Sequence, residues 1–183
     1  IWPFPGRGIF VVLSTSLMAL PPVVVGLLVY LLLSRAGPLG VLGLLFTPGA
    51  MIIAQTILIT PIILALTREA VLPLRRDYTD LLLSVDAGPW LTLSTLVWDG
   101  RFGVLTAILA GFGRALAEVG AVLIVGGNIN HVTRTMTTAI ALETSKGDLA
   151  LALALGIILL GIAFAVNAAL MSLRGTAERA AHA

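Results

Sequence analysis

Three long stretches of this chain contain no charged residue. They run from Gly8 to Ser34, from Ala36 to Thr67 and from Leu149 to Leu173. Each is longer than the roughly 20 residues that an α-helix needs to cross a bilayer. A water-soluble helix of that length would show a polar face, and these stretches do not. The sequence therefore predicts a membrane protein built from helices.

The overall composition agrees with this prediction. Hydrophobic residues make up 58% of the 183 residues and charged residues only 11%, whereas soluble domains carry roughly 25% charged residues. The chain has no cysteine, which excludes disulfides, thiolate metal sites and thiol nucleophiles. The formal net charge is only +2, and the arginines are scattered without forming a basic stripe. We therefore expect membrane lipid, and no nucleic acid, around this chain.

We predict an all-α, polytopic fold in which residues 1–183 form a single transmembrane domain. Four spans are expected, at about 9–34, 47–67, 102–126 and 148–173. Pro21 and Pro22 lie within the first span and Pro61 within the second. Membrane helices tolerate such prolines where neighbouring groups satisfy the freed carbonyls. The pair Pro21–Pro22 is either a gate kink beside a translocation path or a kink that serves packing alone.

The basic residues predict the orientation of these spans. When the first residues are placed in the cytoplasm, most arginines lie on the cytoplasmic side, as the positive-inside rule requires. The cytoplasmic set is Arg7, Arg68, Arg75, Arg76, Arg101, Arg174 and Arg179, and the external set is Arg35, Arg134 and Lys146. The opening segment has the composition of a loop between helices, so we expect at least one further helix before Ile1.

The longest cytoplasmic piece contains a segment, residues 77–99, that is amphipathic and does not span the membrane. Leu81–Val85 gives it an apolar strip, and Asp77 and Thr79 are predicted to cap a short helix there. A strip this apolar is seldom left in water. We therefore expect the segment to pack on a partner.

Arg114 and Glu118 lie inside the third predicted span, within the otherwise apolar and glycine-rich stretch Gly111–Gly127. Four residues apart on a helix, their side chains share one face. Charges at membrane depth usually face a partner, a cavity or a pathway. Two interpretations are open. The pair braces the helix bundle, or Arg114 meets an anion in a translocation path, since guanidinium pairs well with oxyanions.

The stretches Gly111–Ile129, Thr133–Leu160, Leu20–Gly40 and Leu44–Leu66 carry a resemblance to a known family. They resemble the permease subunits of ABC-type tungstate importers, within the molybdate, sulfate and tungstate group. The resemblance implies an importer-type permease bundle in the plasma (inner) membrane of a bacterium or archaeon. It also implies a homodimer with two cytoplasmic ATPase subunits and an extracytoplasmic oxyanion-binding protein.

The permease subunits of this family transport and do not catalyse. This chain has no phosphate loop, so we expect no cofactor in it, and ATP and magnesium in the partner ATPase. Tungstate is the expected anion, favoured by Ala141–Gly147, with molybdate or sulfate as alternatives. An ATP-independent anion transporter or channel is a further alternative. It would show more ionisable groups near the midplane, or broken half-helices in matching repeats.

The resemblance also assigns roles to residues. The family's coupling motif, which contacts the ATPase, is eroded here, because leucines stand where alanines are usual and an aspartate where a glycine is usual. Its positions fall on Asp80, Leu81, Leu82, Asp86, Ala87 and Gly88. The polar external loop with Asn128, Asn130 and Thr133 takes the position of a docking surface for the binding protein, with an ordinary solvated loop as the alternative.

Overall fold

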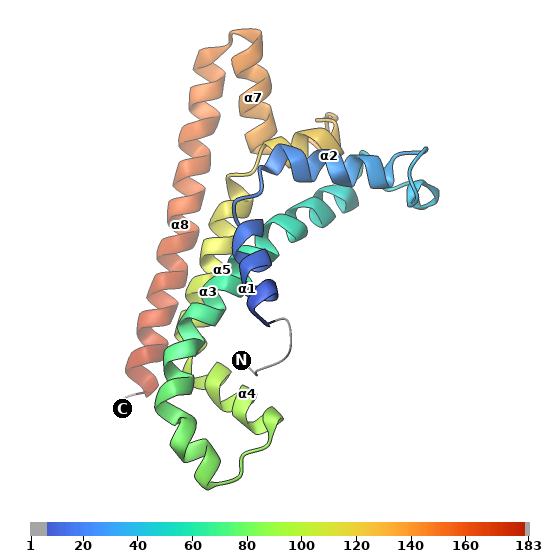
Figure 1. Ribbon diagram of the computed structural model, residues 1–183. Coiled ribbons are helices and arrows are strands. Elements are labelled where there is room, and N and C mark those ends of the chain that lie inside the picture. Colours follow the sequence, from blue (N-terminus) through green and yellow to red (C-terminus); the bar gives the residue numbers. More distant parts are fainter. Residues whose placement is uncertain (1–6, 182–183) are drawn as a thin grey trace. The chain divides into compact units, whose positions relative to one another are not determined.

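The computed structural model describes residues 7–181, and all regular structure in this range is helical. The elements are α1 (Arg7–Leu17), α2 (Pro22–Leu33), the short 3-10 helix η1 (Gly40–Leu42), α3 (Pro48–Ser84), α4 (Pro89–Asp99), α5 (Arg101–Leu116), α6 (Gly120–Gly126), α7 (Met136–Lys146) and α8 (Leu149–Ala181) (Figure 1). The all-α prediction is confirmed. The helices α3 and α8 are long and apolar enough to cross a bilayer, and α4 with α5 counts as a third only if this pair, bent by 71°, is taken as one span. The four predicted spans stay a prediction.

The stretch predicted as the first span contains two helices. The first, α1, ends at Leu17, and α2 begins at Pro22. Proline is well suited to the first position of a helix, because the N–H that it lacks would have no partner there. The Pro21 carbonyl accepts hydrogen bonds from the N–H groups of Val24 and Val25 at 3.0 and 3.3 Å. The proline pair therefore starts a helix and is not a kink inside one.

By contrast, α3 is longer than the span predicted for it. It runs through Pro61 to Ser84, and its 37 residues correspond to roughly 55 Å. Asp77 and Thr79, which were predicted to cap a separate helix, lie inside it. The Thr79 hydroxyl donates to the carbonyl of Arg75 at 2.6 Å, so it bonds back along the same helix. A helix of this length extends beyond a hydrocarbon core of about 30 Å.

The chain forms two compact units, and one of them contains residues 20–58 and 113–183. Its core joins α2, α6 and the first turns of α3 through the buried side chains of Val25, Val29, Leu33, Met51, Leu58, Val122 and Val125 with three alanines. Gly26 of α2 faces Ala121 of α6, and a Cβ on Gly26 would lie 2.7 Å from the Ala121 Cα. Close contact through small residues is typical of membrane helices. In the same unit, α7 and α8 pack side by side (Figure 1).

The other unit contains α1 and residues 59–112. Within it, α5 packs on the later part of α3 through glycines. A Cβ on Gly103 would lie 2.5 Å from the Cβ of Ala70, and one on Gly111 would lie 2.6 Å from Cγ1 of Ile63. Leu96 anchors α4, because its side chain is completely buried.

Candidate functional site

Arg114 and Glu118 meet at a break between two helices. The last turn of α5 contains Arg114, α6 begins only at Gly120, and Glu118 lies in the connection. Arg114 Nη1 lies 3.0 Å from Glu118 Oε2. The spacing of the two residues predicted their contact correctly. The expectation of one continuous helix through both was wrong, because the stretch predicted as the third span is interrupted.

Both carboxylate oxygens of Glu118 are engaged. Oε2 receives Arg114, and Oε1 accepts a hydrogen bond from the backbone N–H of Ala121 at 3.0 Å. That N–H belongs to the first turn of α6 and has no partner within the helix. The carboxylate therefore caps α6 at the end where the helix dipole favours negative charge. Its side chain is only 4% exposed, so this cap is a buried one.

Two polar side chains that sequence analysis did not single out hold the same break. Gln55 of α3 donates from Nε2 to the carbonyl of Ala115 at 3.3 Å. Thr137 of α7 donates from Oγ1 to the carbonyl of Glu118 at 3.1 Å. Both help to satisfy backbone carbonyls that leave the helical pattern where α5 ends. Gln55 is the only amide side chain in the apolar run Ala36–Thr67, and that signal identifies it in retrospect.

Arg114 is the more exposed partner of this ion pair. Its side chain is 39% exposed, and it donates a hydrogen bond to Glu118. A guanidinium has five N–H donors, so most of them are not used by this ion pair. The ion pair gives the two helices the contact expected of a structural brace. It also leaves N–H donors of Arg114 that do not bond Glu118. Both interpretations of the pair are therefore compatible with its surroundings.

The predicted coupling residues lie where α3 ends and α4 begins. Asp80, Leu81 and Leu82 belong to the last turns of α3, Asp86 and Ala87 to the turn, and Gly88 is the N-cap residue of α4. The large apolar side chains exposed around this turn and along α4 are Leu81, Leu83, Val85, Trp90, Leu91, Val97 and Trp98. Leu82 is only half-buried. The segment thus presents an apolar surface that no described residue covers.

Asp86 has a backbone conformation that glycine adopts more easily than other residues. Its φ is +46°, in the left-handed region that glycine adopts most easily. The N–H of Ala87 donates to the Leu82 carbonyl at 2.9 Å, and the N–H of Asp86 donates to the Leu83 carbonyl at 3.1 Å. These two bonds form a Schellman motif, whose left-handed residue is usually glycine. Aspartate is among the few residues that also tolerate this conformation.

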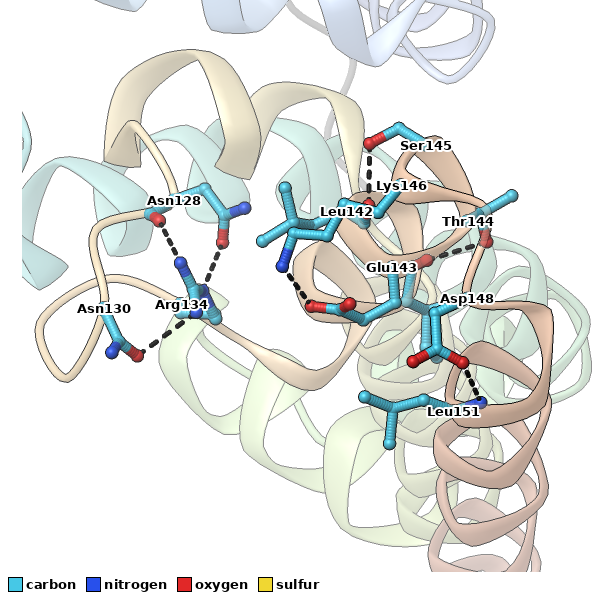
Figure 2. Close-up of polar contacts among 11 residues, drawn as sticks. Asn128, Asn130, Arg134, Leu142, Glu143, Thr144, Ser145, Lys146, Asp148 and Leu151 are labelled. Carbon is cyan, nitrogen blue, oxygen red and sulfur yellow. Dashed lines mark hydrogen bonds and ion pairs between the residues drawn. The ribbon is translucent and has the colours of Figure 1, made fainter.

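The residues predicted to dock a binding protein divide into two kinds. Asn128 and Asn130 both accept hydrogen bonds from the side chain of Arg134 (Figure 2). Thr133 is only 2% exposed. Its hydroxyl bonds to two backbone groups of the same loop, at 2.5 and 2.9 Å. Thr133 therefore holds the loop from inside, and docking by these residues stays a prediction.

A cavity of about 690 Å³ lies among α1, α3 and α4. Most of its lining is aliphatic, but Arg68, Glu69 and Arg76 also contribute. Arg114 is not among the lining residues. In the part of the chain that the structure describes, no three acidic or histidine side chains come together to hold a metal ion.

Comparison with known proteins decides the family. Over 170 residues, the sequence is 44% identical to the "Probable anion ABC transporter permease protein" of Haloferax volcanii, covering 90% of this chain and 73% of that protein. This chain belongs to the ABC transporter permease family. The permease is also 43% identical over 161 residues to the tungstate uptake system permease protein TupB of Campylobacter jejuni, covering 88% of this chain and 67% of that protein.

A more distant relative is the molybdenum transport system permease protein ModB of Azotobacter vinelandii, which is 31% identical over 131 residues, 67% of this chain and 58% of that protein. The permease matches no known family model and no solved structure. The resemblance carried by Gly111–Ile129 and the other matching stretches is confirmed by the relatives. Its family and its long apolar helices make the permease a multi-pass protein of the plasma membrane.

Proposed function

We propose that the permease forms the membrane path of an ATP-driven oxyanion importer and that tungstate is the transported anion. The observation that carries this proposal is the 43% identity to two tungstate uptake permeases, those of Campylobacter jejuni and Peptoclostridium acidaminophilum. The lower identity of 31% to the molybdenum permease makes molybdate the second candidate.

The proposed importer contains two copies of the permease, two ATPase subunits and an extracytoplasmic binding protein. ATP hydrolysis belongs to the ATPase, since the permease has no phosphate loop. The exposed side chains of Leu83 and Trp90, at the end of α3 and the start of α4, support attachment of the ATPase there. Exposed apolar patches rimmed by polar residues commonly mark protein contacts. The Schellman motif at Asp86 gives this surface a defined shape.

The exposed part of the Arg114 guanidinium supports a role in anion passage. Glu118 neutralises the guanidinium and holds it in place, while the unused N–H donors can meet an oxyanion. A cation already paired with a carboxylate attracts a dianion less strongly than an unpaired one. Weak binding suits transit, because an ion that enters a path must also leave it. Selectivity among oxyanions is then assigned to the binding protein.

Uptake of labelled tungstate into proteoliposomes tests this function. The permease is reconstituted with its ATPase, and the binding protein is supplied outside. We expect accumulation that requires both hydrolysable ATP and the binding protein. Equal concentrations of unlabelled molybdate or sulfate should compete less well than unlabelled tungstate. Accumulation without ATP would instead indicate a channel or secondary transporter, and stronger competition by molybdate would make the permease a molybdate importer.

A further inference from the structure

The cavity among α1, α3 and α4 has mostly aliphatic walls. Its volume of about 690 Å³ lies within the range of roughly 300–1,000 Å³ that is typical of ligand sites. The residues that line it all belong to one compact unit. Walls of this kind do not suit a small hydrated ion, whose water would be lost without replacement contacts. The aliphatic lining includes Val11, Leu64, Leu66, Leu72, Leu93 and Val97.

The wall formed by α1 and the turn after it is apolar in effect. Val11, Thr15 and Met18 line the cavity, and their spacing of four and three residues places them on one face of a helix. The Thr15 hydroxyl donates to the Val11 carbonyl at 2.9 Å, so its hydrogen bond is made within α1. This wall therefore offers the cavity mainly apolar groups.

Charged residues line the cavity along one part of α3 only. Arg68, Glu69 and Arg76 contribute to the lining, and all three are exposed. Arg68 is the first charged residue after the charge-free run Ala36–Thr67. Arginines near the end of a membrane helix place the charged head at the lipid–water interface and the stem along apolar surface. The cavity thus combines apolar walls with guanidinium groups at the level expected for lipid phosphates.

The net charge of the lining favours an anionic ligand. Two guanidinium groups and one carboxylate leave a charge of +1. Guanidinium pairs well with phosphate oxygens. A free phosphate would use these arginines but leave the aliphatic walls without contacts. An anionic phospholipid matches both parts of the lining, because it joins a phosphate to an acyl chain.

We infer that this cavity binds an anionic phospholipid, with an acyl chain against the aliphatic walls and the phosphate at Arg68 and Arg76. Basic pockets between membrane helices on the cytoplasmic side bind anionic headgroups, and this part of α3 is predicted to be cytoplasmic. The inference goes beyond the proposed function, because it requires neither the ATPase nor the transported anion.

Photocrosslinking in nanodiscs tests the site in the complete transporter. The nanodiscs consist of phosphatidylcholine with a trace of phosphatidylglycerol that carries a diazirine in its acyl chain. A phosphatidylcholine probe with the same acyl chain is the lipid control. The readout is the label on residues 64–72 and 93–97, divided by the label on α8, which reports the surrounding lipid. The reference residues on α8 are the exposed Leu153, Leu160 and Phe164.

We expect a higher ratio with phosphatidylglycerol than with phosphatidylcholine. Each arginine near an anionic lipid contributes a preference of roughly fivefold, so Arg68→Gln and Arg76→Gln should each lower the ratio by about that factor. Arg75→Gln is the matched control, since Arg75 lies next to Arg76 and does not line the cavity. Equal ratios for the two lipids in the unmodified transporter, or an equal loss in Arg75→Gln, overturn the inference.

Ala65→Phe tests the cavity itself while both arginines are kept. Ala65 lines the cavity, so the larger side chain should exclude the acyl chain and bring the ratio for phosphatidylglycerol down to that for phosphatidylcholine. An unchanged ratio in this variant, with an unchanged melting temperature, overturns the inference even if the arginine variants do not fold. Inorganic phosphate at constant ionic strength should leave the ratio unchanged. Displacement of the lipid by phosphate would make the cavity a free-anion site instead.

Discussion

The Glu118 carboxylate binds the Arg114 guanidinium at 3.0 Å across the break between α5 and α6, and the two partners are unequally buried. Glu118 is 4% exposed and Arg114 is 39% exposed. Glu118 also caps α6 through Ala121. Loss of the carboxylate therefore removes two interactions, whereas loss of the guanidinium removes one and leaves the other intact.

We predict that Glu118→Ala and Arg114→Ala each destabilise the permease. Removing one partner of a buried ion pair costs about 3–5 kcal/mol, because the remaining charge is left uncompensated. Arg114→Ala leaves the Glu118 carboxylate, which is only 4% exposed, without its cation, and Glu118→Ala also removes the cap on α6. The double variant Arg114→Leu with Glu118→Gln should recover most of the folded protein, since glutamine can still accept from Ala121. Thermal unfolding in detergent and tungstate uptake per folded permease are the measurements.

Exchange of the two residues separates a simple ion pair from a cap. Arg114→Glu with Glu118→Arg keeps both charges but places a cation at the start of α6, where the helix dipole disfavours it. We expect this variant to be unstable. A stable exchanged variant would show that the cap on α6 contributes little.

Gly26→Ala should destabilise the contact between α2 and α6. The new Cβ would lie 2.7 Å from the Ala121 Cα, and overpacking of this kind costs about 1–3 kcal/mol. Gly156→Ala is the control, because no atom lies within 4 Å of its Cβ position on α8. Alanine there should be neutral or stabilising by up to ~1 kcal/mol. Equal melting temperatures for both variants would rule out close packing at Gly26.

Asp86→Gly should stabilise the turn between α3 and α4. A left-handed conformation costs a residue with a Cβ roughly 1–2 kcal/mol, less for aspartate, so we expect a gain of up to ~1 kcal/mol. Asp80→Gly, inside α3, should instead destabilise by ~1 kcal/mol. Thermal unfolding distinguishes the two. A loss of stability in Asp86→Gly would mean that the aspartate side chain itself makes a needed contact.

Leu83→Asp should uncouple the ATPase while the permease stays inserted. Leu83 is 74% exposed next to the predicted coupling residues, so the change adds a charge without disturbing the core. Val41→Asp, at a 98% exposed position of η1, is the control and should leave coupling unchanged. The readout is ATP hydrolysis stimulated by the loaded binding protein. Full stimulation in Leu83→Asp would place the ATPase contact elsewhere.

Cysteine labelling can determine the topology cleanly, because the chain has no cysteine of its own. Ser145→Cys and Thr79→Cys introduce thiols at exposed positions. An impermeant maleimide added to intact cells should label Ser145→Cys alone, and inverted vesicles should reverse the result. Labelling of both variants from one side would contradict the predicted orientation.

Charge-free runs were sufficient to locate α3 and α8, because an uninterrupted apolar sequence of that length is typical of a membrane-spanning helix. The contact between Arg114 and Glu118 also followed from spacing alone. The break that separates them did not, because it depends on hydrogen bonds from Gln55 and Thr137, which are distant in sequence. The break before α2 did have a local signal, since a residue that precedes proline disfavours the helical conformation.

The contact between Gly26 and Ala121 also has a consequence for the order of events during synthesis. Ribosomes add roughly 5–20 residues per second, so α6 emerges on the order of 4–20 seconds after α2. During that interval Gly26 of α2 has no partner helix to pack against. With 12 residues, or roughly 18 Å, α2 is also too short to cross a bilayer alone. The nascent chain must therefore hold an incomplete membrane element, sheltered by the insertion machinery or by lipid, until its later half arrives.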